Sequence, residues 1–268
     1  MDNRPIGVFD SGFGGLTVTK GLMSLLPKES IIYFGDTARV PYGTRSKNTI
    51  IKYGQQDVNF LISQNVKMIV VACGTVSSVA LAHLQKTHDI PIIGVVSSTA
   101  KAAATATRNK KVGVIGTKGT INSGSFEDEL LRLDGKIETV SRACPLFVPL
   151  VENRFATNQA AYLIAEQYLE PLKQRGVDTI ILGCTHFPLL KGVISAIMGA
   201  DTKLIDCAAP TAAKVADVLA KSNALSDQDA VYKFYVSDSA DEFTDFAELF
   251  LNREIPNADV MQVDIERY

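Results

Sequence analysis

The segment MIVVACGTVSS, residues 68–78, has the pattern of a buried strand followed by a turn, and TIILGCTHFPLL, residues 179–190, repeats this pattern. In both, an apolar run typical of a buried β-strand ends at a cysteine, Cys73 or Cys184, and small hydroxyl or glycine residues follow. Open α/β sheets place their active sites where such strands give way to turns. The matched settings of the two thiols suggest paired chemistry.

A second repeat supports this interpretation, because a single buried cysteine is more often only a small core residue. The segment IGVFDS, Ile6 to Ser11, is echoed by VGVIGT, Val112 to Thr117. The two members of each pair are separated by similar lengths of chain. The sequence therefore indicates two related halves.

Composition points to a globular protein with a small-molecule ligand. The chain has 268 residues, 46% hydrophobic and 21% charged, and a net charge of −2, which gives no electrostatic footprint for nucleic acid or an anionic membrane. The opening MDNRPIGVFDSG lacks a signal-peptide pattern, so we expect a cytoplasmic location with four reduced cysteines. The cysteine spacing has no C-x-x-C pair, which argues against a zinc site.

Strand-like runs alternate with helical patterns along the chain, which predicts an α/β fold with parallel-type sheets flanked by helices. The expected strands are Ile6–Phe9, Ser30–Phe34, Met68–Ala72, Ile92–Val95, Lys111–Ile115, Lys136–Ser141, Thr179–Leu182, Thr202–Ile205 and Tyr232–Val236. The expected helices are Leu16–Leu26, Thr49–Gln64, Ser77–Gln85, Ser123–Arg132, Gln159–Gln174 and Ala209–Ala220.

The domain boundary is expected near an alanine-rich helical stretch, Ser97 to Arg108. This stretch precedes Lys111–Ile115, the first expected strand of the second half. We expect a first α/β domain over residues 1–97 and a second over 98–207. From the residues alone the tail could pack on either half. We assign residues 208–268 to the first domain.

Two glycine-containing turns are candidate ligand sites. In GVFDSGFGG, Gly7 to Gly15, a strand leads into a turn that could aim backbone N–H groups at an anion, although neither a P-loop nor a G-x-G-x-x-G pattern is present. Asp10 there is a helix cap or a site residue. In YFGDTARVPYG, Tyr33 to Gly43, Asp36 and the PYG turn either make an ordinary loop or hold donors against a ligand.

Two further side chains could support proton transfer. Glu152 ends the apolar segment ACPLFVPLVE and is either a solvated glutamate or a site carboxylate. His186 lies two residues beyond Cys184, where it either begins a helix or acts beside the thiol, since imidazole titrates near neutrality.

Together these motifs resemble the cofactor-independent amino-acid racemases, and glutamate racemases in particular. GVFDSGFGGLTV, YFGDTARVPYG, the ACGT segment, CPLFVPLVE and GCTHFPLL occur in that family's order over nearly the whole chain. The resemblance implies two α/β domains related by a pseudo-twofold axis, with the active site in the cleft between them. It also implies an enzyme that supplies D-glutamate for peptidoglycan, and hence for cell-wall biogenesis and cell shape.

The family chemistry needs two thiols, because inversion requires a base and an acid on opposite faces of one carbon. By the resemblance, Cys73 serves the D-enantiomer and Cys184 the L-enantiomer. A helix start beside each cysteine would lower its thiol pKa from about 8.5. The resemblance implies no cofactor, no metal, and a homodimer as the common assembly.

The resemblance also assigns roles to the remaining residues. Asp10 and His186 would assist proton transfer beside Cys73 and Cys184, with Asp36 and Glu152 in supporting catalytic roles. The expected substrate-binding residues are Asp10, Ser11, Pro41, Tyr42, Gly43, Gly74, Thr75, Thr117, Thr185 and His186.

One position departs from the family pattern: the usual Cys-Asn-Thr reads Cys73-Gly74-Thr75 here. The missing amide would lower affinity, admit a water molecule in its place, or shift substrate preference. This leaves an aspartate or other amino-acid racemase as the main alternative. A cysteine hydrolase using one thiol with His186, and a binding protein with weakened catalysis, are more distant ones.

Overall fold

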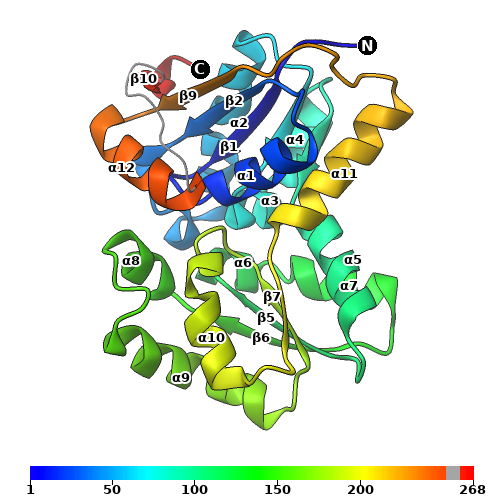
Figure 1. Ribbon diagram of the computed structural model, residues 1–268, viewed down its shortest axis with the longest axis vertical. Helices are drawn as coiled ribbons and strands as arrows, with labels where there is room; N and C mark the ends of the chain where they lie inside the picture. Colours follow the sequence, from blue (N-terminus) through cyan, green and yellow to red (C-terminus); the bar gives the residue numbers. More distant parts are fainter. Residues whose placement is uncertain (252–259) are drawn as a thin grey trace.

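The computed structural model describes residues 1–251 and 260–268 and contains two parallel β-sheets, one in each half of the molecule (Figure 1). The first sheet has the order β10-β9-β2-β1-β3-β4, and the second β6-β5-β7-β8. The first is built from β1 (Ile6–Asp10), β2 (Ile31–Gly35), β3 (Met68–Val71), β4 (Ile92–Gly94), β9 (Tyr232–Val236) and β10 (Val260–Gln262). The second is built from β5 (Lys111–Gly116), β6 (Glu138–Ala143), β7 (Thr179–Leu182) and β8 (Lys203–Ile205).

Helices cover both faces of each sheet, as parallel sheets require. On the first sheet, α1 (Leu16–Leu25), α11 (Ala208–Lys221) and α12 (Ala240–Leu251) pack on one face, and α2 (Lys47–Ser63), α3 (Gly74–Val79) and α4 (Leu81–Thr87) on the other. On the second, α5 (Val96–Ala106) and α7 (Ser125–Leu133) pack on one face, and α8 (Phe147–Glu152), α9 (Gln159–Gln174) and α10 (Lys191–Met198) on the other. The predicted α/β class is confirmed.

Alternation of buried side chains explains this layering. Ile180 and Leu182 of β7 join the core under α9 and α10, whereas Ile181 between them joins the core under α5 and α7. Strands buried on both faces read as continuous apolar runs, which is why the predicted strands fall within two residues of the observed ones. The short edge strand β10 was missed.

Two predicted helices differ from the structure. The single helix expected over Ser77–Gln85 is divided into α3 and α4 at Ala80, whose φ of −116° departs from helical geometry. The helix expected over Ser123–Arg132 begins instead at Ser125, as α7. Gly124, with a φ of +67°, separates it from the preceding short helix α6 (Lys118–Asn122). None of the helices in the described part of the chain has the length and apolar character needed to cross a membrane.

Because the strands are parallel, the candidate site residues that follow them lie at one edge of each sheet. β1, β2 and β3 all end at the same edge of the first sheet, and β5 and β7 end at the matching edge of the second. The turns after these strands face one another between the halves. The domain boundaries at residues 97/98 and 207/208 stay a prediction.

Candidate active site

Both cysteines line one pocket between the two sheets. Cys73 follows β3 and caps α3, and Cys184 follows β7; their exposed fractions are 4% and 6%. The first half contributes Ser11, Val40, Pro41, Tyr42, Gly43, Cys73, Gly74 and Thr75, and the second half Thr117, Val148, Cys184, Thr185 and His186. The sequence did not single out Val40 and Val148, which are apolar walls with no chemical signature.

Asp10 is fully buried at the end of β1. Its carboxylate accepts hydrogen bonds from the Gly12 N–H at 3.1 Å and the Thr185 hydroxyl at 3.4 Å. Burial raises the pKa of Asp10, and the nearby His186 opposes this rise. Cys73 Sγ lies 3.6 Å from the Ser11 hydroxyl oxygen. Asp10 does not line the pocket, and its charge contributes to the raised pKa of the Cys73 thiol.

His186 connects Cys184 to Glu152. Its Nδ1 atom lies 3.9 Å from Cys184 Sγ, and its Nε2 atom lies 3.1 Å from the Glu152 carboxylate at the end of α8. A carboxylate can only accept, so Nε2 carries the proton in this contact and Nδ1 is free to accept one from the thiol. Phe250 of α12 packs edge-on against the imidazole, with ring centroids 5.6 Å apart.

Burial keeps both thiols protonated in the ligand-free protein. It raises the pKa of Cys73 to about 12, with a contribution from Asp10, and raises the pKa of Cys184 well above its usual value. Backbone N–H groups near each helix start, those of Val76 and His186, do lower these pKa values, but by less than burial raises them. Helix α3 is short, and Cys184 is separated from the 3₁₀ turn η3 (Phe187–Leu190) by two residues, so desolvation dominates.

Hydroxyl groups meet across the pocket. Thr75 and Thr117 oxygens lie 2.9 Å apart, and Thr117 also caps α6 by accepting from the Thr120 N–H. Gly43, in the 3₁₀ turn η2 (Tyr42–Thr44), approaches Thr117 so closely that a Cβ at this glycine would lie 2.6 Å from Thr117 Cβ. The η2 turn therefore spans the cleft by close backbone contact.

Gly74 also marks a close contact between the halves. A Cβ at this position would lie 2.1 Å from the carbonyl oxygen of Gly183, the residue before Cys184. Protein backbone therefore occupies the space where a side chain at position 74 would begin, so this space is not free for a water molecule.

Asp36 lies outside the pocket lining, although the sequence placed it among the catalytic candidates. Its buried carboxylate accepts from the Tyr42 hydroxyl, from Arg39 Nε at 2.6 Å and from the Ser237 hydroxyl at 2.8 Å. With both oxygens engaged, it supports the loop that carries Tyr42. The sequence missed its partner Arg39 and the second carboxylate that Arg39 and Tyr42 contact, Asp57. The signal for Asp57 was a carboxylate in the apolar stripe of α2.

The described residues contain no group of three or more His, Cys, Asp or Glu side chains placed to hold a metal ion. The polar groups of the pocket are hydroxyls, backbone N–H groups and one imidazole. Such groups can bind the carboxylates and the ammonium group of an amino acid.

Comparison with known proteins agrees with this geometry. The sequence model of the Asp/Glu/Hydantoin racemase family matches residues 6–215. A glutamate racemase of Geobacter metallireducens is 46% identical over 268 residues, covering 99% of this chain and 98% of that protein.

Solved structures agree as well. Glutamate racemase isoform RacE1 from Bacillus anthracis superimposes with a TM-score of 0.94 at 40% identity, covering 98% of both chains. Glutamate racemase from Francisella tularensis, solved in complex with D-glutamate, gives 0.92 at 40% identity, covering 100% of both. With the fold, the paired thiols and these relatives in agreement, the chain belongs to the Asp/Glu/Hydantoin racemase family.

Proposed function

We propose that this protein interconverts L-glutamate and D-glutamate without a cofactor, using Cys73 and Cys184 as the two bases. The observation that carries the proposal is that these two thiols, one from each half, line a single pocket. Relatives of closely similar sequence and length are glutamate racemases, and one of them was solved with D-glutamate bound.

In the reaction, one thiolate removes the α-proton from one face of the substrate and the other cysteine, as a thiol, donates a proton to the opposite face. Cys73 acts on D-glutamate with Asp10 near it, and Cys184 acts on L-glutamate with His186 and Glu152. The substrate ammonium group brings a positive charge into the pocket, which favours the thiolate that burial opposes. His186 Nδ1 can hold the proton of Cys184.

The α-proton is weakly acidic, so the pocket must stabilise the developing carbanion with preorganised donors. Ser11, Thr75, Thr117 and Thr185 supply hydroxyl groups at the pocket wall. The N–H groups of Gly74 and Thr75, at the start of α3, have no acceptor within their own helix and are available to a carboxylate. Together they orient the substrate between the two sulfur atoms.

D-glutamate made here would serve peptidoglycan synthesis in the cytoplasm. The four cysteines are all free thiols, which is consistent with a reducing compartment. We further propose a homodimer, which light scattering on the purified protein would test.

The test of the function is to incubate the protein with L-glutamate in heavy water and follow optical rotation together with α-deuterium. Loss of optical signal with deuterium in the D-product supports cofactor-free racemisation by proton exchange. Turnover of aspartate, with none of glutamate, would contradict the proposed substrate.

A further inference from the structure

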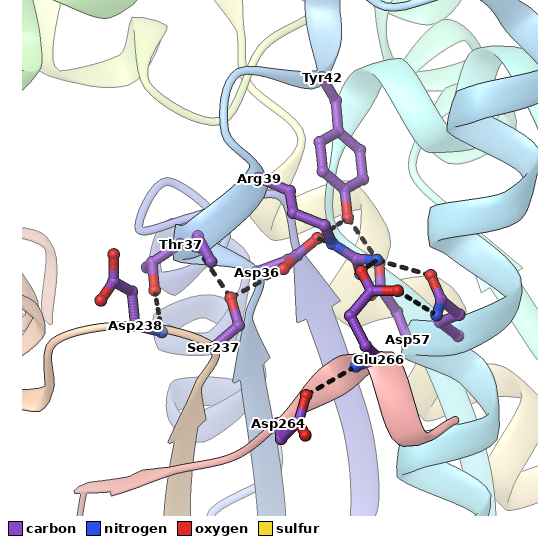
Figure 2. Close-up of polar contacts among 11 residues, drawn as sticks. Asp36, Thr37, Arg39, Tyr42, Asp57, Ser237, Asp238, Asp264 and Glu266 are labelled. Carbon is purple, nitrogen blue, oxygen red and sulfur yellow. Dashed lines mark hydrogen bonds and ion pairs between the residues drawn. The ribbon is translucent and has the colours of Figure 1, made fainter.

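A buried ionic cluster, whose polar contacts Figure 2 shows, adjoins the substrate pocket through Tyr42. It consists of Asp36, Arg39, Tyr42 and Asp57, with Glu266 at its outer edge. The side chains of Asp36 and Asp57 are both 0% exposed, and that of Arg39 is 10% exposed. Charges buried to this extent need a complete set of partners, or they destabilise the fold.

Arg39 supplies those partners. Its guanidinium donates to Asp36 at 2.6 Å, to Gln56 at 2.6 Å and to Asp57 at 3.2 Å. It also lies over the Tyr53 ring, 4.1 Å from the centroid. A planar fork of donors can satisfy these acceptors together, whereas the single ammonium group of a lysine cannot.

Tyr42 connects the cluster to the pocket. Its hydroxyl donates to Asp36 and lies 3.2 Å from Asp57 Oδ2. One hydroxyl proton cannot serve two carboxylates, and burial raises the pKa of Asp57 well above its usual value. Tyr42 and Arg39 both contact the Asp57 carboxylate, at 3.2 Å each.

The same turn reaches the substrate and the second half of the molecule. Pro41, Tyr42 and Gly43 line the pocket, and Gly43 packs on Thr117 across the cleft. Holding the Tyr42 hydroxyl fixes the backbone of η2. A displaced η2 would move both the pocket wall and the contact with Thr117.

The C-terminal segment closes the cluster from outside. Ser237, after β9, donates to Asp36 and accepts from the Ala38 N–H at 2.9 Å. Glu266, in the 3₁₀ turn η5 (Ile265–Arg267), accepts from Arg39 at 3.1 Å. Figure 2 shows both residues approaching the Asp36–Arg39 loop from strands and turns distant in sequence.

We propose that Arg39 is a positioning residue for the amino-acid substrate: held between Asp36 and Asp57, it fixes the Tyr42–Gly43 turn at the pocket wall. Glu266, in the C-terminal turn η5, accepts a further hydrogen bond from the Arg39 guanidinium. This inference rests on the proposed function, because the pocket wall in question is that of the racemase site.

The test compares Arg39→Gln with Lys67→Gln. Lys67 forms a buried ion pair with Glu29, both side chains 2% exposed, at the start of β3 and so at the opposite end of the sheet from the pocket. Both variants should lower the melting temperature. Only Arg39→Gln should also raise the KM and the calorimetric Kd for D-glutamate, by about tenfold, with a smaller loss of kcat.

A melting-temperature loss in Arg39→Gln with KM and Kd equal to those of Lys67→Gln overturns the inference. If Arg39→Gln does not fold, Arg39→Lys decides: a KM at least about threefold above wild type supports positioning by the guanidinium fork, and an unchanged KM overturns it. If the wild-type protein does not racemise glutamate, the proposed function fails, and the Kd comparison alone still tests Arg39.

Discussion

At the scale of single residues, the protonated state of Cys73 sets the pH behaviour of the free protein. Because burial raises the pKa of this thiol to about 12, its thiolate fraction rises about tenfold for each pH unit across the neutral range. Alkylation of Cys73 by iodoacetamide should rise with the same slope between about pH 6 and pH 9. Peptide mass spectrometry measures this rate, and a plateau below about pH 8 would show a lowered thiol pKa instead.

Gly74 determines how closely the two halves approach. Any side chain here meets the Gly183 carbonyl oxygen, so Gly74→Ala and Gly74→Asn must displace the turn that carries Cys184. We expect kcat/KM for glutamate to fall by about tenfold or more in both variants.

The matched control for Gly74 is Gly135→Ala, since a Cβ there meets nothing within 4 Å. It should leave kcat/KM unchanged. If Gly74→Asn restored or raised kcat/KM, the contact with Gly183 would not govern the site.

At the scale of secondary-structure elements, α8 ends at Glu152 and so positions its carboxylate against His186. Glu152→Gln keeps an acceptor oxygen but removes the charge that stabilises a protonated imidazole. We expect kcat to fall by about tenfold for both enantiomers. Steady-state circular dichroism measures this kcat. The control is Glu166→Gln, on the exposed face of α9. Equal kcat values in the two variants would show that Glu152 takes no part in proton transfer.

The elements also show what the sequence could predict. Strands such as β3 and β7 are buried on both faces, so their apolar runs are visible without any structure. The role of Asp36 could not be predicted, because its partner Ser237 and the Glu266 contact of Arg39 come from the far end of the chain. The raised thiol pKa values were missed for a related reason: desolvation depends on how the two halves close over the pocket.

At the scale of the whole molecule, one thiol from each half lies at a common pocket between the two sheets. Two similar halves facing each other are suited to a substrate whose two faces must be treated alike. Since the enantiomers have equal free energies, kcat/KM must be the same in both directions. The proposed two-thiol mechanism requires both thiols for turnover in either direction.

The most direct test of this account is to follow racemisation of glutamate in heavy water by Cys73→Ser and Cys184→Ser, with Cys144→Ser as control. Cys144 is buried in the core and does not line the pocket. We expect both pocket variants to lose inversion by at least about a hundredfold, while Cys144→Ser racemises like the wild type. Racemisation at the wild-type rate by either pocket variant would contradict the two-thiol mechanism.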